Sequence, residues 1–235
     1  EKYKDDISFY NYVNYFLIYD DTSIVKSFIE NSLEIIDNSN DFSIPWKNMH
    51  YIWKLFLENN NLPNMMYFAN LKEMLKVNLN FNEENDCFLN VTSKYLPKIS
   101  NFLQFWEKNF YILGTDQELL FELDIYDLEI EELIFLYKDK TGFVISEVEV
   151  LNILNHFASN LIIENKCILN AKCYISLWNK FEDLKTFFEL HPLNQETYDL
   201  DKLYEIYCNY LEKENKYKSS KVYFSKYISN IILFN

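Results

Sequence analysis

Two stretches near the C-terminus follow the same helix-turn-helix pattern, and this repeat limits the possible folds more than any other feature. In the first stretch, apolar residues at helical spacing within 132–137 precede a short break and then Ser146. In the second, a similar run within 202–207 precedes a longer break and then Ser220. Apolar residues that return every three or four positions predict amphipathic helices, and extra length in a surface turn costs little free energy. The repeat therefore predicts two related helix pairs.

The residues around the first pair predict its local structure in more detail. Ser146 and Glu149 have the spacing of a capping box, and Ile145 with Val150 has that of a hydrophobic staple. Behind this helix, two β-prone runs flank residues 164–166, whose central asparagine suits the tip of a tight turn. Helix, helix and hairpin follow one another in winged-helix domains. The first pair is therefore predicted to be a winged-helix-like unit.

Helical periodicity also dominates the N-terminal half. Stripes of Trp, Phe and other apolar residues at this spacing are far more often the core of a bundle than a cofactor site or a base-stacking surface. Asn64 is expected to cap the fourth of these helices. The predicted helices contain the stripes Tyr10 to Leu17, Ile24 to Ile36, Trp46 to Leu57, Phe68 to Leu75 and Ile99 to Phe110.

These patterns together predict a mainly α protein. We expect a helical bundle domain over residues 1–112, then an acidic connector and winged-helix-like unit with one β-hairpin over 113–178. A second, related helix pair with a basic, tyrosine-rich end is expected over 179–235. The chain begins at Glu1 rather than Met, which suggests a piece of a longer polypeptide.

Composition argues against several classes of function. All 22 basic residues are lysine and only two glycines occur. The chain therefore lacks the guanidinium fork that binds phosphate bidentately, and it cannot build a glycine-rich phosphate cradle. This bias matches an extremely AT-rich genome, so the missing arginine says little about mechanism. The net charge of -14 also disfavours non-specific DNA coating, which needs a basic surface.

No cofactor or structural metal is predicted. The four cysteines lack CxxC spacing, which argues against a zinc module and a disulfide framework and fits a reducing, intracellular compartment. If the protein is viral, this means the host cytoplasm or a viral factory. The sequence contains neither a membrane-spanning apolar run nor a signal peptide. No membrane association is therefore expected.

Residues 116–149 are strongly acidic and contain only Lys138 and Lys140 as basic residues. The simplest interpretation is a solvated connector from Asp116 to Asp127 followed by a solvated helix face. The alternative is a surface that binds a basic protein partner. A divalent cation is not predicted, because the spacing matches no EF-hand loop and lacks its turn glycine. The acids considered for such a cation are Asp124, Asp127, Glu129, Glu131 and Glu132.

The C-terminal end has the opposite charge, since residues 216–235 contain no acid. Lysines there can neutralise phosphates, and exposed tyrosines can stack on single-stranded bases. The alternative interpretation is an ordinary helix surface, because Phe224, Ile228 and Ile231 must face the core if the helix is amphipathic, and a lysine-bearing outer face is then normal. On the first unit, two acids at the start of the second helix repel phosphate, which favours protein contact there. The candidate nucleic-acid-binding residues are Lys216, Lys218, Lys221, Tyr223, Lys226 and Tyr227, with Lys166 and Lys172 on the predicted wing.

The string at 203–210, followed by the Ser-led string at 220–228, resembles the C-terminal region of poxvirus-type primase-helicases of large DNA viruses. In that region, a helix with spaced tyrosines precedes a Ser-led helix that carries Phe. The order of Leu96-Pro97, Phe105-Trp106-Glu107, an acidic stretch and residues 133–137 is also similar to proteins of giant viruses. The resemblance spans at most residues 95–235 and includes none of the ATPase motifs. The resemblance implies an accessory segment beside an ATPase, or a stand-alone relative, and it assigns no catalytic residue.

No catalytic constellation stands out. Glu164-Asn165-Lys166 is similar to half of a metal-dependent nuclease motif, but no upstream Asp completes it and a hairpin turn explains it better. Placement at helix ends and in loops accounts for His50, His156 and His191. The leading prediction is a non-enzymatic DNA-binding or assembly module of a viral replication protein. The alternative is a helical protein-interaction scaffold with no role in nucleic-acid binding.

Overall fold

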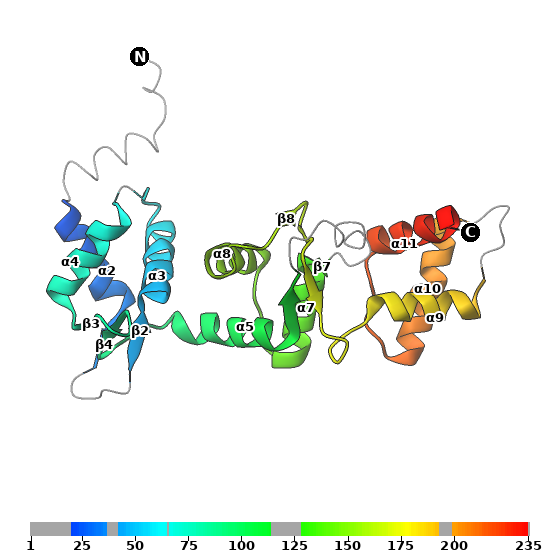
Figure 1. Cartoon of the computed structure of the whole chain (residues 1–235), viewed down its shortest axis with the longest axis horizontal. Coiled ribbons are helices and arrows are strands. Elements are labelled where there is room, and N and C mark those ends of the chain that lie inside the picture. The colour runs from blue at the N-terminus through cyan, green and yellow to red at the C-terminus, as the bar shows by residue number, and fades with distance from the viewer. Residues whose placement is uncertain (1–19, 37–41, 65, 114–127, 193–198, 235) are drawn as a thin grey trace, which may run out of the picture. The chain divides into compact units, whose positions relative to one another are not determined.

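This computed structural model describes residues 20–36, 42–64, 66–113, 128–192 and 199–234 (Figure 1). The described part is mainly helical and carries a few short antiparallel strand pairs, which confirms the predicted fold class. The chain divides into two compact units, residues 1–101 and 102–235. Within the described ranges, every helix is too short or too polar to cross a lipid bilayer.

The first unit packs helices around small sheets. Its helices are α2 (Asp21–Ser32), α3 (Trp46–Asn59), α4 (Phe68–Asn78) and the first part of α5 (Leu96–Asn109). Its strands are β1 (Glu34–Ile35), β2 (Ser43–Pro45), β3 (Phe81–Asn82), β4 (Cys87–Leu89) and β5 (Val91–Thr92), which form the sheets β1-β5 and β2-β4-β3. In the core, the ring of Phe28 on α2 meets Trp53 and Phe56 of α3 edge-on at 5.2 and 5.5 Å between centroids.

The structure corrects the predicted N-terminal bundle in two respects. Each strand of the first unit has two or three residues, which is too short for an alternating pattern to identify. Helix α4 begins at Phe68 behind Tyr67, so Asn64 is not its N-cap. The helix predicted at Tyr10 to Leu17 lies outside the described residues.

The second unit contains both predicted helix pairs. Its helices are the remainder of α5, α7 (Ile130–Thr141), α8 (Glu147–Phe157), α9 (Lys180–Leu190), α10 (Leu200–Glu214) and α11 (Lys221–Phe234). Its strands are β6 (Phe110–Ile112), β7 (Leu128–Glu129), β8 (Ile163–Glu164), β9 (Cys167–Ile168) and β10 (Ala171–Cys173). They form a β10-β6 pair and a β7-β9-β8 sheet, all antiparallel.

The first pair, α7 and α8, has the predicted local structure. The Ser146 and Glu149 side chains form the capping box, with Ser146 N donating to Glu149 Oε2 at 2.9 Å and Glu149 N donating to Ser146 Oγ at 3.3 Å. The hairpin β8-β9 turns through Asn165 and Lys166, whose φ angles of 48° and 66° are those of a two-residue turn. The predicted order of helix, helix and hairpin is confirmed.

The second pair, α10 and α11, is also present and has a core of its own with α9. The hydroxyl oxygen of Ser220 accepts from Tyr223 N at 3.1 Å and so caps α11. Aromatic rings fill the space between the three helices, which explains why this pair is richer in aromatic residues than the first. Its buried residues are Leu184, Phe187, Phe188, Tyr207, Leu211, Tyr223, Phe224, Tyr227 and Ile228.

The compact units do not follow the predicted domain boundaries. Residues 110–112 form β6, which pairs with β10, so they belong with the second unit and not with the N-terminal bundle. The ranges predicted as separate at residue 178 lie in one unit. Within it, Glu132 of α7 pairs with Lys180 of α9, and Glu129 of β7 bonds to Ser220 just before α11. The predicted connector from Asp116 to Asp127 lies outside the described residues.

Candidate functional site

A cavity of about 330 Å³ in the second unit is lined by β7, the first half of α7, Trp178, α10 and the segment between α10 and α11. We call it the glutamate cavity, after Glu129, Glu131 and Glu132. Aromatic side chains and the segment from Tyr217 to Lys221 form the rest of its lining. The aromatic lining residues are Phe135, Trp178, Tyr204 and Tyr217.

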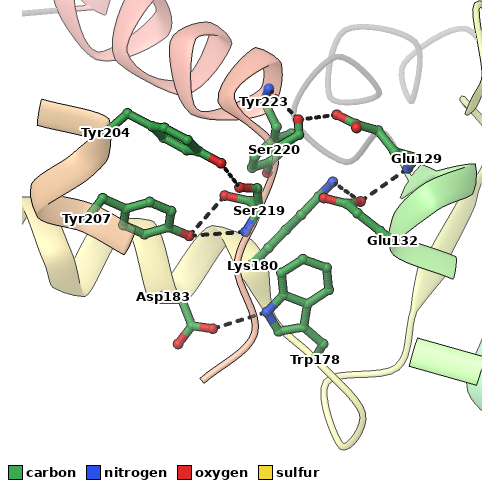
Figure 2. A network of polar contacts seen from close by, with 10 residues as sticks. All are labelled: Glu129, Glu132, Trp178, Lys180, Asp183, Tyr204, Tyr207, Ser219, Ser220 and Tyr223. Carbon is green, nitrogen blue, oxygen red and sulfur yellow. Dashed lines mark hydrogen bonds and ion pairs between the residues drawn. The ribbon is translucent and has the colours of Figure 1, made fainter. Parts of the chain in front are cut away.

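Glu132 is the buried charge of this cavity, with only 7% of its surface exposed. Its Oε2 atom accepts from Lys180 Nζ at 2.9 Å and from the backbone N–H of Glu129 at 3.1 Å (Figure 2). Its Oε1 atom is also buried and has no hydrogen-bond partner in the described part of the chain. Burial raises the pKa of Glu132, and the charge of Lys180 offsets this only in part. The single ion pair therefore leaves the Glu132 carboxylate incompletely satisfied.

Two serines hold the segment between α10 and α11 in place. Ser219 is completely buried, and its carbonyl oxygen and hydroxyl bond to the hydroxyls of Tyr204 and Tyr207, both at 2.9 Å. The Ser220 hydroxyl donates to Glu129 at the start of α7 (Figure 2). Burial raises the pKa of Tyr207, so this phenol stays protonated at neutral pH. The serines thus fix one wall of the cavity against the other.

Tyr217 connects the aromatic wall to α7. Its hydroxyl donates to Asp139 at 2.6 Å, and its ring meets those of Phe135 and Trp178 at centroid distances of 5.8 Å each. The hydrogen bond from Tyr217 is the main reason that the pKa of Asp139 is lowered. The Trp178 indole N–H donates to Asp183 at 3.2 Å. These contacts give the cavity a wall of oriented aromatic rings.

Three of the lysines that were predicted to bind nucleic acid lie beside this cavity, and carboxylates lie close to them. Lys216 pairs with Asp183 of α9 at 2.8 Å, and Lys221 pairs with Asp201 of α10. Lys218 is exposed and lines the cavity, where it has no ion pair with any residue that the structure describes. The structure therefore gathers these three lysines in one segment but surrounds them with acids.

The two candidate tyrosines do not offer their rings to solvent, contrary to the prediction of base stacking. Tyr223 is 2% exposed, and the ammonium of Lys180 lies 3.8 Å from its ring centroid. Tyr227 is 8% exposed and stacks on Phe188. They are core residues, because α11 needs its aromatic face to pack against α9 and α10. Lys226 lies on the exposed surface of α11.

The two lysines of the predicted wing are not among the residues that line the glutamate cavity, although the backbone carbonyl of Lys166 accepts from Ile130 N at 2.9 Å, beside Glu129 and Glu131. Lys166 sits in the turn of the β8-β9 hairpin and pairs with Glu147 of α8 at 3.0 Å. Lys172 lies on β10 opposite Tyr111 and lines a different cavity, of about 220 Å³. That second cavity also contains Cys173, and burial raises the pKa of its thiol to about 11, so it is not a thiolate at neutral pH.

The acids considered for a cation are only partly described. Asp124 and Asp127 lie outside the described residues. Among the residues that the structure does describe, no three His, Cys, Asp or Glu side chains are grouped as metal ligands would be.

Sequence reasoning missed the centre of this site. Lys180 and Trp178 precede or begin a helix with no recognisable motif, and nothing in the sequence pairs Lys180 with Glu132, 48 positions away. Glu132 was visible only as one of several acids. Its position three residues after Glu129 at a helix start was the one local signal, because this is the spacing of a capping glutamate.

Comparisons with known proteins add no relative. No protein-family model matches the chain, and no curated protein or solved structure is significantly similar to it. The resemblance to viral primase-helicases therefore stays a prediction from the sequence.

Proposed function

We propose that this chain is a non-enzymatic protein-interaction module whose second unit binds a basic partner through the acids at the start of α7. The observation that supports this best is the pairing of the candidate DNA-binding lysines. Lys216, Lys221 and Lys166 each sit within ion-pair distance of a carboxylate from a neighbouring element. These carboxylates would repel a phosphate backbone and so offset the attraction of the lysines.

Physical reasoning favours a protein partner over DNA. Exposed ion pairs are weak, so phosphate could displace them one at a time, but the displaced carboxylates would stay beside the phosphate. Binding through counterion release needs a surface whose net charge is positive. Here Glu129 and Glu131 lie beside the same segment as Lys218 and Lys221, and the whole chain has a net charge of -14. A basic protein surface meets no such repulsion.

This proposal keeps the assembly part of the sequence-based prediction and gives up its DNA-binding part. In the predicted setting of a large-DNA-virus replication protein, the module would hold a partner protein rather than the nucleic acid. The acidic surface at 128–149 is the described part of the region in which a protein partner was predicted.

A selection from a displayed random-peptide library tests the proposal. The bait is the full chain, and the binders are then titrated against two charge reversals, Glu131→Lys and Glu212→Lys. Both glutamates are exposed, but only Glu131 lines the glutamate cavity. We expect basic peptides whose affinity falls at least about tenfold with Glu131→Lys and stays within about twofold of wild type with Glu212→Lys.

Two results would overturn the proposal. One is an equal loss of affinity in both variants, which would mean attraction to the overall negative charge alone. The other is the absence of any saturable peptide binder.

A further inference from the structure

The glutamate cavity combines two features that bind organic cations in proteins. Glu129, Glu131 and Glu132 line it together with aromatic rings that include Trp178 and Tyr217. Carboxylates form short, charge-assisted hydrogen bonds with ammonium and guanidinium groups. Aromatic faces attract the same groups, most strongly when the cation is withdrawn from water.

The state of the buried Glu132 carboxylate is an independent observation that points to a cationic ligand in this cavity. The side chain is buried, one oxygen is bound by Lys180 and Glu129, and the other has no partner in the described part of the chain. A buried acceptor without a partner loses the hydrogen bond that water would otherwise give it, and this destabilises the folded state. A second positive charge in the cavity would stabilise the ionised Glu132 carboxylate. It could do so by contacting Oε1 directly, or by electrostatic attraction from a nearby position in the cavity.

The size of the cavity limits what the cation can be. Its volume of about 330 Å³ is at the lower end of the range, about 300–1,000 Å³, that small-molecule pockets occupy. No three metal-ligating side chains are grouped among the residues that the structure describes. A single basic side chain with its neighbouring backbone therefore fits better than a metal ion or a large cofactor.

We infer that the glutamate cavity binds one arginine or lysine side chain of the partner protein, an inference that rests on the proposed function. The cationic end lies against Glu129 and Glu131, and its aliphatic stem lies along Tyr217 and Trp178. Lys221 does not oppose this, because Asp201 neutralises it. Lys218 is exposed and lines the cavity, where it can donate to the backbone carbonyls of the bound peptide.

Indole N–H resonances of the full chain provide a direct test. The chain has four tryptophans, and only Trp178 lines the cavity, so a Trp178→Phe sample assigns its signal. The probes are acetyl-Gly-Arg-Gly-amide, its lysine counterpart, and the citrulline peptide, which keeps the shape of arginine without the charge. We expect a saturable shift of the Trp178 signal with the arginine or lysine peptide, and none with citrulline.

A matched pair of variants separates the cavity from the overall charge. Glu131→Gln and Glu212→Gln each remove one exposed negative charge, but only the first lines the cavity. The dissociation constant of the basic peptide should rise about tenfold for Glu131→Gln and change less than about twofold for Glu212→Gln. Equal effects of the two variants, or equal binding of citrulline, would overturn the inference.

The same measurements distinguish this inference from the proposed function. Displayed binders that depend on Glu131 while the tripeptides leave Trp178 unshifted would refute the side-chain site and retain the interaction module. Conversely, if the arginine peptide binds saturably in the cavity but the displayed library yields no binder, the cation site is retained and the interaction module is refuted.

Discussion

The two helix pairs of the second unit share a local design but are held in different ways. In both, the first helix ends in a left-handed residue, Gly142 after α7 and Asn215 after α10. In both, a serine caps the second helix. Ser146 forms its capping box with Glu149 of the same helix, whereas Ser220 donates to Glu129, 91 positions earlier. The capping serine of the first pair thus bonds within its own helix, whereas that of the second pair, which has its own core with α9, also bonds to a residue of the first.

This difference separates structural lysines from surface lysines. Lys166 beside the first pair forms an exposed ion pair, while Lys180 at the start of α9 is buried against Glu132. Similar charges in sequence therefore have different roles in the fold. A segment rich in lysine and tyrosine that resembles a nucleic-acid-binding surface can instead be a packing contact between two parts of the fold.

The largest effect should come from Lys180→Met, which leaves the Glu132 carboxylate buried without its cation. Breaking a buried ion pair from one side costs about 3–5 kcal/mol. Urea unfolding should therefore show a loss of this order, whereas Lys166→Met, at the exposed pair, should change stability little. The added substitution Glu132→Gln should recover part of the loss. Equal losses of stability in the two lysine variants would mean that the buried and the exposed ion pair contribute equally to folding.

Tyr207→Phe should have the next largest effect. It removes the hydroxyl that bonds to buried Ser219, and an unsatisfied buried polar group costs about 1–3 kcal/mol. Tyr210→Phe on the same helix is the control, because its hydroxyl forms no hydrogen bond with any described residue. Chemical denaturation of both variants measures the difference. If Tyr207→Phe lowers the free energy of unfolding no more than Tyr210→Phe does, the bond between Tyr207 and Ser219 does not fix the segment before α11.

The two capping serines offer the sharpest comparison between the pairs. Ser146→Ala and Ser220→Ala should each cost about 1 kcal/mol from the lost helix cap. In a double-mutant cycle with Glu129→Ala, which removes the acceptor, only Ser220→Ala should show coupling, because Ser220 bonds to Glu129 and Ser146 bonds to Glu149. Coupling of Glu129 to both serines, or to neither, would contradict the conclusion that Ser220 links the second helix pair to the first through Glu129.

The smallest effect concerns Asp139, whose pKa is lowered mainly by the hydrogen bond from Tyr217. A carboxyl whose folded-state pKa is depressed adds stability above its unfolded-state pKa, and this stability is lost as the pH falls through the folded-state pKa. Tyr217→Phe should move the pKa of Asp139 back toward the ordinary value, which carboxyl carbon NMR can follow. An unchanged pKa would mean that Tyr217 does not bond to Asp139 in solution.

How far the sequence could predict this structure depended on the range of each interaction. Caps, helix periodicity and the tip of the β8-β9 hairpin involve residues close in sequence, and their patterns predicted α3, α8 and the hairpin well. The pairing of β6 with β10, over three residues each, and of Glu132 with Lys180 joins segments that are distant in sequence. No periodic pattern marks such contacts, so they appeared only in the structure.

The same limit explains the candidate site. Lysine and tyrosine at 216–227 suggested a basic face, because sequence alone gives the charge of a segment but not the charge of the segments that pack against it. Asp183 and Asp201, which pair with Lys216 and Lys221, lie on other helices. The amphipathic pattern of this helix predicted that Phe224 and Ile228 face the core, which the structure confirms, but the prediction did not include Tyr223 and Tyr227, which are also buried.

Fluorescence anisotropy of labelled single-stranded and duplex DNA, titrated with the full chain across a salt series, tests the central claim most directly. A second titration uses the chain with Lys216, Lys218, Lys221 and Lys226 replaced by Gln. Because Lys216 and Lys221 are paired with carboxylates and Lys218 lines a cavity with three glutamates, we predict no saturable binding to either DNA even at low salt, and no difference between the two chains. Saturable binding that weakens with salt and is lost in the lysine variant would contradict the account and restore the C-terminal end as a nucleic-acid surface.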